Sequence, residues 1–311
     1  LKILFGILIG MSLFQSCWEE DEIIPGEQEM VLRFEFPQGN NSWDEDLVAI
    51  QEQFGVCMIY KDLDSSDLSR SWTGTGFVST QYRGENLTDE QAEFYTNFFK
   101  NHVFAYLRPE ITQRVLPPYW YMMYDFHAAW DFGMMIIKTD LTYYNEGLDF
   151  WVTCLEGEYN SFTGLQTKRP ETAAEYLQYR GWIFSMIFTE ACENGTIVIP
   201  EEFHVGFDYQ TEVTYLPEYE DDENFYIRRG FPGRMVNGFN FTSLQSIVRT
   251  NRTDNFVQYL NLGMRYTKEE YEALWPSSDY PFIYEKRQFV IDYMKNTYNI
   301  DLEAIQRGPQ I

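Results

Sequence analysis

The stretch from Pro170 to Phe203 reads PETAAEYLQYRGWIFSMIFTEACENGTIVIPEEF, and it predicts the helix around which the rest of the chain is arranged. Apolar side chains recur in it at helical spacing, which requires one buried face: Tyr176, Tyr179, Ile183, Met186 and Ile187. A proline suits a first helical turn, and Asn194-Gly195 is a typical C-terminal stop. The sequence therefore predicts a core helix of moderate length.

One residue in the middle of this helix is unexpected. Gly181 lowers helix stability by about 1 kcal/mol relative to alanine. Helix propensity therefore does not account for its presence between Arg180 and Trp182.

The residues around Gly181 resemble a motif. Arg180-Gly-Trp-Ile-Phe184 aligns with the HExxH of a family of Bacteroidota lipoproteins named for zinc-binding metallopeptidase activity. Ile199-Pro-Glu-Glu-Phe203 resembles the segment that follows, and the ending Ile300-Asp-Leu302 is the most specific match. The resemblance covers about residues 43–306. It implies an α+β, zincin-like scaffold, with a small mixed sheet packed on a central helix and a mainly helical C-terminal part.

The aligned residues lack the chemistry of a zinc site. HExxH works because two imidazoles at i and i+4 share a helix face, while the glutamate activates a metal-bound water. Arg180 is cationic and has no lone pair to give, Phe184 cannot coordinate, and Gly181 cannot accept a proton. No HxxxH exists anywhere in the chain, because its histidines are His102, His127 and His204. We therefore expect no metal and no cofactor.

A second segment resembles a part of the family that brings another acid towards the metal. Thr253-Asp-Asn-Phe-Val-Gln258 occupies that place, with Asp254 as a retained acid and Gln258 in place of the final glutamate. A catalytic zinc needs about three protein ligands. The resemblance thus implies a pseudo-metallopeptidase, whose degenerate former site comprises Arg180, Gly181, Phe184, Asp254 and Gln258.

The N-terminal region has the pattern of a lipoprotein precursor. Lys2 precedes an apolar run, 3–14, which is too short to span a bilayer but suits a signal peptide over residues 1–16. Cys17 then resembles a lipidation site, although an ordinary secretory signal with an incidental cysteine is the alternative. Four acids within 18–22 resemble the tag that directs such lipoproteins to the outer leaflet, and residues 17–42 would form an acidic tether.

Composition excludes one class of partner. The 311-residue chain carries a net charge of −25, which repels phosphate backbones, so nucleic-acid binding is not expected. Membrane attachment should come through the lipid anchor rather than through anionic lipid. With 44% hydrophobic residues the chain can bury a sizeable core.

Residues 43–311 are expected to form the zincin-like domain, with a sheet-containing part to about residue 205 and a helical part over 206–311. We predict helices over 43–54, 88–106 and 284–298, and strands over 55–60, 116–124, 130–138 and 148–155. Cys57, Cys154 and Cys192 match no metal pattern and are interpreted as free thiols, with one disulfide left open. His127, near two acids, is interpreted as a hydrogen-bonded structural residue.

Family members are often encoded beside a TonB-dependent transporter and its lid lipoprotein. The resemblance therefore implies an accessory or scaffold subunit of an outer-membrane complex, anchored by lipid at the cell surface. Two alternatives stay open. The 8 Trp and 23 Tyr residues would suit a glycan-binding surface lipoprotein. An active zinc peptidase with unfamiliar ligands would use His127 or His204 with Asp254.

Overall fold

The computed structural model describes residues 33–70, 80–131, 133, 135–236, 240–242 and 251–309. The chain divides into two compact units, Leu1–Glu35 and Phe36–Ile311, and every element below belongs to the second. The predicted signal peptide and Cys17 lie outside the described residues. Among the helices of the described ranges, none is long and apolar enough to cross a membrane.

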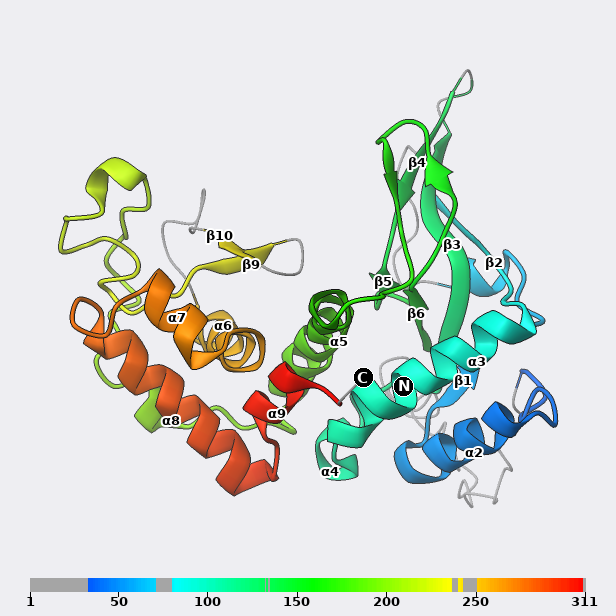
Figure 1. Cartoon of the computed structure of the whole chain (residues 1–311), viewed down its shortest axis with the longest axis horizontal. Coiled ribbons are helices and arrows are strands. Elements are labelled where there is room, and N and C mark those ends of the chain that lie inside the picture. Colours follow the sequence, from blue (N-terminus) through cyan, green and yellow to red (C-terminus); the bar gives the residue numbers. More distant parts are fainter. Residues whose placement is uncertain are drawn as a thin grey trace, which may run out of the picture. The chain divides into compact units, whose positions relative to one another are not determined.

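A mixed six-stranded sheet forms one part of the Phe36–Ile311 unit (Figure 1). Its strands are β1 (Cys57–Ile59), β2 (Thr80–Glu85), β3 (Tyr119–Asp131), β4 (Ile136–Asp140), β5 (Tyr143–Tyr144) and β6 (Phe150–Cys154). The order is β1-β3-β6-β5, in which β3 runs parallel to β1 and β6, and β5 runs antiparallel to β6. The C-terminal half of β3 pairs antiparallel with both β2 and β4. The predicted α+β class with a small mixed sheet is confirmed.

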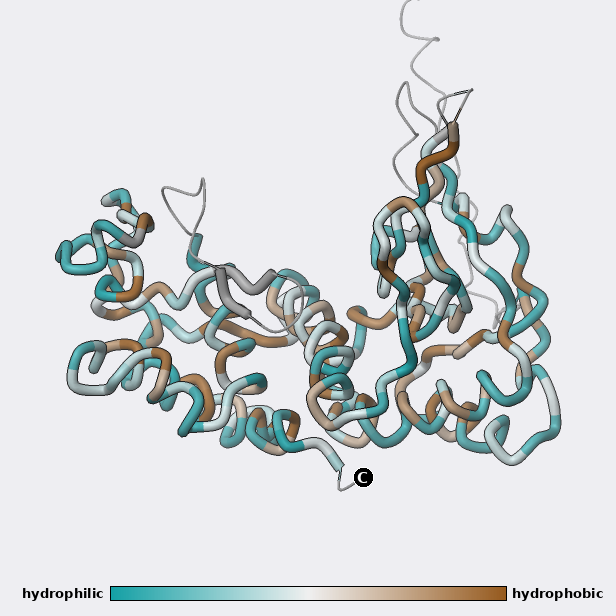
Figure 2. The backbone as a smooth tube through the Cα atoms, turned by 45° about the horizontal axis from the view of Figure 1, so that its top comes forward, coloured by the Kyte–Doolittle hydropathy of each residue, from teal (hydrophilic) through white to brown (hydrophobic). Residues whose placement is uncertain are grey.

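The helices are α2 (Ser42–Phe54), α3 (Asp89–Phe98), α4 (Pro109–Thr112), α5 (Ala173–Glu193), α6 (Arg252–Arg265), α7 (Lys268–Leu274), α8 (Pro281–Tyr298) and α9 (Leu302–Arg307). Shorter elements are η1 (Asp67–Ser69), the π-helical turn η2 (Phe99–Val103), η3 (Phe104–Tyr106), η4 (Glu201–His204), η5 (Pro217–Tyr219), β7 (Tyr159–Asn160), β8 (Leu165–Gln166), β9 (Arg234–Val236) and β10 (Asn240–Thr242). The tube in Figure 2 alternates between hydrophobic and hydrophilic within the turns of most helices, as one buried face requires.

Two predicted elements differ from the structure. Residues 130–138, predicted as one strand, form the end of β3 and the start of β4, which pair through Trp130 and Ile137. Gly133 has φ 80° and lies between them, in the left-handed region that favours glycine. Residues near the end of the predicted tether already belong to the compact unit, because Gln38 is buried and its amide nitrogen donates to the Lys61 carbonyl at 2.6 Å.

Helix α5 begins where its capping box places it. The Thr172 hydroxyl accepts from the backbone N–H of Glu175 at 3.3 Å, and the Glu175 carboxylate accepts from the backbone N–H of Thr172 at 2.9 Å. The helix therefore starts at Ala173, as the sequence predicts, and Pro170 precedes it. It ends at Glu193, followed by Gly195 with φ 75°, as the Asn-Gly pair predicts.

α5 lies between the sheet and helices α6–α8 (Figure 1), and packs against α6, α9 and η2. Its residues Ile183, Phe184 and Ile187 belong to the same hydrophobic cluster as Trp120 of β3 and Trp151 of β6. The prediction of a central core helix is thus confirmed. The three described cysteines are free thiols, as predicted: Cys57, Cys154 and Cys192.

Candidate functional site

Arg180 is built into the fold. Its side chain is 1% exposed, its Nε donates to the Ile305 carbonyl at 2.6 Å, and its Nη2 donates to the Gln306 carbonyl at 3.0 Å. Its Nη1 lies 2.9 Å from Nδ1 of His102. Arg180 therefore fastens the C-terminal helix α9 and the turn η2 to α5.

His102 is held neutral by this contact. A guanidinium can only donate, so the Nδ1 of His102 accepts and its proton resides on Nε2. The ring stacks on Phe98 at 5.3 Å and on Tyr176 at 4.5 Å between centroids. Burial, together with the charge of Arg180, lowers the pKa of His102 to about 4.

The reason for Gly181 is a second arginine. A Cβ at position 181 would lie 2.6 Å from Nε and 2.8 Å from Cζ of Arg265, which comes from the last turn of α6. Arg265 is 3% exposed, and none of its three guanidinium nitrogens has a hydrogen-bond partner among the described residues. Burial lowers the pKa of Arg265 to about 9. Sequence reasoning identified the glycine as unusual but did not identify Arg265.

Phe184 is fully buried and packs edge-on against Tyr106 at 6.4 Å between ring centroids. Residues two positions apart on a helix point about 200° apart. Since Trp182 lines the cavity described below, Arg180 and Phe184 both point away from it. The two positions aligned with the zinc-binding histidines therefore face the interior of the protein.

Asp254 lies on α6, near Glu193 at the C-terminal end of α5. It is exposed in the first turn of α6, where its carboxylate accepts from the side-chain amide of Asn251 at 2.7 Å. It lines a cavity of about 830 Å³ together with Glu193. Residues 180 and 193 are thirteen residues apart, about 20 Å along a helix. The structure therefore does not bring Asp254 to Arg180, and Gln258 lies half-buried one turn further along α6.

The histidines considered as unfamiliar ligands lie in different elements. Nδ1 of His127, on β3, is 2.6 Å from the Asp125 carbonyl and 3.5 Å from its carboxylate. Nδ1 of His204, on η4, is 2.7 Å from the hydroxyl of Tyr209, which lines the same cavity as Asp254. His204 and Asp254 therefore belong to one neighbourhood, whereas His127 belongs to the sheet.

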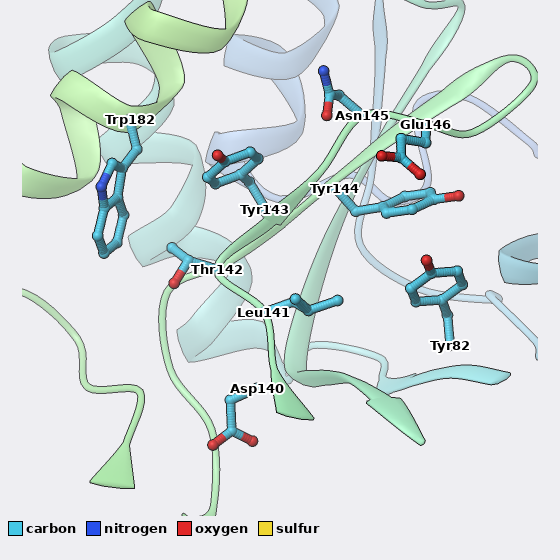
Figure 3. A pocket seen from close by; sticks show the side chains of 9 residues that line it. All are labelled: Tyr82, Asp140, Leu141, Thr142, Tyr143, Tyr144, Asn145, Glu146 and Trp182. Carbon is cyan, nitrogen blue, oxygen red and sulfur yellow. The ribbon is translucent and has the colours of Figure 1, made fainter. Parts of the chain in front are cut away.

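A smaller cavity of about 430 Å³ opens between α5 and the edge of the sheet (Figure 3). Its lining consists of Tyr82, Asp140, Leu141, Thr142, Tyr143, Tyr144, Asn145, Glu146 and Trp182. Tyr143 is 41% exposed and points towards Trp182, whereas Tyr144 points the other way, towards Tyr82 (Figure 3). The rings of Tyr82 and Tyr144 are 4.4 Å apart. We call this cavity the edge-strand cleft, because β5 supplies its centre.

The residues at these sites do not fit a zinc ion. Within the described ranges, no three His, Cys, Asp or Glu side chains are grouped so that they could hold a metal. The α5 residue that lines the edge-strand cleft is Trp182, which offers no lone pair. We therefore derive no chemical step through a metal.

Fold and site together define an α+β protein with a buried arginine pair in its central helical layer and an aromatic cleft at its sheet edge. No protein-family model matches the sequence, and no curated protein matches it. Among solved structures, the chain is similar to the crystal structure of "a putative zinc-binding metallo-peptidase" from Bacteroides caccae. The two are 10% identical with a TM-score of 0.46, over 86% of this chain and 92% of that chain.

Proposed function

We propose that this protein is a catalytically inactive, metallopeptidase-like surface lipoprotein that acts as an accessory or scaffold subunit of an outer-membrane protein complex. The partners expected from the sequence resemblance are a TonB-dependent transporter and its lid lipoprotein. The edge-strand cleft would be the surface that contacts the partner.

One observation carries the proposal. The helix that would supply the metal ligands of a peptidase instead uses Arg180 to bind the carbonyls of Ile305 and Gln306. A residue that makes three contacts inside the fold is not free for catalysis, and the aligned Phe184 has no donor atom.

The edge-strand cleft supports a binding role. Among the described strands β5 is the last in the order β1-β3-β6-β5, and we propose that its outer edge takes an extended segment of another polypeptide. Tyr143 and Trp182 beside it are large, half-exposed aromatic side chains, the type that dominates binding energy at protein interfaces.

Co-purification tests the proposal. The tagged protein is recovered from its native outer membrane in mild detergent, together with the variants Trp182→Ala and Tyr143→Ala. The matched control is Leu274→Ala, which truncates a side chain that is 50% exposed on α7. We expect stoichiometric partner protein with the parent and with the control, and at least tenfold less with the cleft variants. Recovery of the parent protein alone would contradict the proposal.

Glycan binding is the second candidate, and the lining of the same cleft favours it. Tyrosine and tryptophan rings can stack on sugar rings, while Asn145, Asp140 and Glu146 offer hydrogen bonds to hydroxyl groups. Glycan-array binding that disappears in Trp182→Ala but persists in Leu274→Ala would establish this function in place of the first.

A further inference from the structure

We propose that Arg265 is the anion-binding group of the edge-strand cleft and that it takes a carboxylate of a bound peptide. The inference deepens the proposed function and rests on it, since it names the chemistry by which the cleft would hold a partner polypeptide.

Arg265 differs from the other buried cations of the described residues, which are Arg180, Lys286 and Arg287. Arg180 donates to two carbonyls. Lys286 lies within 6 Å of three phenyl rings, and Arg287 donates to the Tyr266 carbonyl while facing the ring of Tyr271. Among the buried cations of the described residues, Arg265 is the one whose three guanidinium nitrogens all lack a hydrogen-bond partner.

Such an arrangement is rare because an unpaired buried charge is costly. Buried polar groups are almost always hydrogen-bonded, and a buried guanidinium presents five donors in a rigid, planar fork. The two oxygens of a carboxylate match that fork with two parallel hydrogen bonds. The missing partner of Arg265 is therefore most simply a carboxylate supplied from outside the described residues.

The position of Arg265 connects it to the cleft. Its guanidinium lies against Gly181, and the next residue along α5 is Trp182, which lines the cavity. Tyr143, which points towards Trp182 in Figure 3, lies close enough to Arg265 to influence the pKa of its guanidinium. A carboxylate that passes between Trp182 and Tyr143 would therefore approach Arg265.

The surroundings favour a peptide over a free anion. Asp140 and Glu146 line the cleft, and the whole chain has a net charge of −25, so a small free anion is repelled. A peptide that pairs with the outer edge of β5 gains backbone hydrogen bonds that offset this repulsion. Either a C-terminal carboxylate or an acidic side chain would supply the same two oxygens.

Retention on the immobilised full chain tests the inference. The probes are pools of N-acetylated hexapeptides with a free C-terminal carboxylate, the same pools as C-terminal amides, and amide pools with one glutamate. Galacturonate and inorganic phosphate are run beside them. We expect at least one carboxylate-bearing pool to be retained threefold or more above the amide pool. This ratio should fall to about one on Arg265→Met and stay unchanged on the control Arg287→Met.

Equal retention of all pools on the parent protein, or an unchanged ratio on Arg265→Met, would overturn the inference. Retention of galacturonate or phosphate without retention of peptides would overturn the peptide assignment. If Arg265→Met fails to fold, Gly181→Ala serves instead, because its Cβ displaces the guanidinium. A partner that co-purifies equally with parent and Arg265→Met would leave the proposed function standing while this inference fails.

Discussion

At the scale of single residues, Arg180 and Arg265 show two ways in which a protein interior can hold a guanidinium. Arg180 satisfies its donors with carbonyls of α9 and with His102. Arg265 has a flat surface to lie on, the backbone of Gly181, but no acceptor in the described residues. We therefore expect Arg180→Met to lower the free energy of unfolding, whereas Arg265→Met should leave it unchanged or raise it.

Gly181 and Arg265 should be coupled in stability. Gly181→Ala gains about 1 kcal/mol of helix propensity, but its Cβ overpacks the guanidinium, which typically costs about 1–3 kcal/mol. We expect Gly181→Ala to destabilise the parent protein and to be neutral or stabilising in an Arg265→Met background. The coupling, measured by urea unfolding of all four proteins, should be about 1–3 kcal/mol.

Arg265→Met alone should leave the free energy of unfolding unchanged or raise it, because an apolar side chain removes an unpaired buried charge. Additive effects of the two substitutions would show that residue 181 does not contact Arg265 in solution.

The sequence identified Gly181 as unexplained by helix propensity, but it could not identify the cause. The contacting guanidinium comes from α6, whose last turn is 84 residues away in sequence. Helix propensity indicates that something other than helix formation selects glycine at position 181. Only the packing of α5 against α6 shows that the cause is the space taken by Arg265. The same packing separates Asp254 from Arg180, which an alignment of short segments cannot reveal.

At the scale of elements, α5 connects η2 and α9 through one side chain. Arg180→Met leaves the carbonyls of Ile305 and Gln306 without these donors, and each buried unpaired group costs about 1–3 kcal/mol. We expect the free energy of unfolding to fall by about 2–4 kcal/mol, with faster amide exchange in α9.

The control for this substitution is Lys295→Met. It removes another cation that contacts the region of α9, through an exposed ion pair with Asp301 at 3.3 Å. Exposed pairs contribute about 0–1 kcal/mol. Equal destabilisation by the two substitutions would mean that Arg180 does not fasten α9.

His102, which contacts Arg180 between η2 and α5, should make the stability of the protein sensitive to acid. Its pKa is about 4 in the folded protein against an ordinary 6.5, so the unfolded chain binds the proton more readily between these values. Stability from His102 is fully present above pH 6.5 and is lost as the pH falls towards 4, by up to about 3 kcal/mol.

The test is the pH dependence of urea unfolding for the parent and for His102→Gln, whose amide oxygen can still accept from Arg180. We expect the parent to lose more stability than the variant between pH 6.5 and 4. Parallel curves would show that His102 titrates normally in the folded state.

Most elements could be predicted from the sequence because their signals are local. The capping boxes at Thr88 and Thr172 fix two helix starts, and periodic apolar residues mark α5 and α8. The hairpin of β3 and β4 was missed because a nearly continuous run of apolar residues flanks Gly133 on both sides. β5 has two residues, too few for any periodicity, so the edge-strand cleft could not be predicted.

At the scale of the whole molecule, the family resemblance implied the α+β architecture, while the periodic apolar residues of 170–203 predicted its central helix. The arrangement of cavities did not follow. Each cavity depends on which face of a helix turns towards which neighbour, and a shift of one or two residues moves a side chain from a cleft to the core. Trp182 and Arg180 illustrate this, because they are two positions apart on α5, yet Trp182 lines the cleft and Arg180 is buried.

The last prediction concerns metal in the intact protein. A zinc ion that binds the folded chain more tightly than the unfolded chain stabilises the fold, so its removal by a chelator lowers the unfolding temperature. Neither the residues aligned with HExxH nor any other group of three His, Cys, Asp or Glu in the described ranges can hold such an ion. We therefore expect the protein purified without chelator to contain far less than one zinc per chain by elemental analysis. Its unfolding temperature should shift by less than about 1 °C with EDTA or with added zinc, and peptide-library hydrolysis should not depend on either. One tightly bound zinc per chain, with hydrolysis lost in EDTA and restored by zinc, would contradict the proposal that this protein is an inactive scaffold.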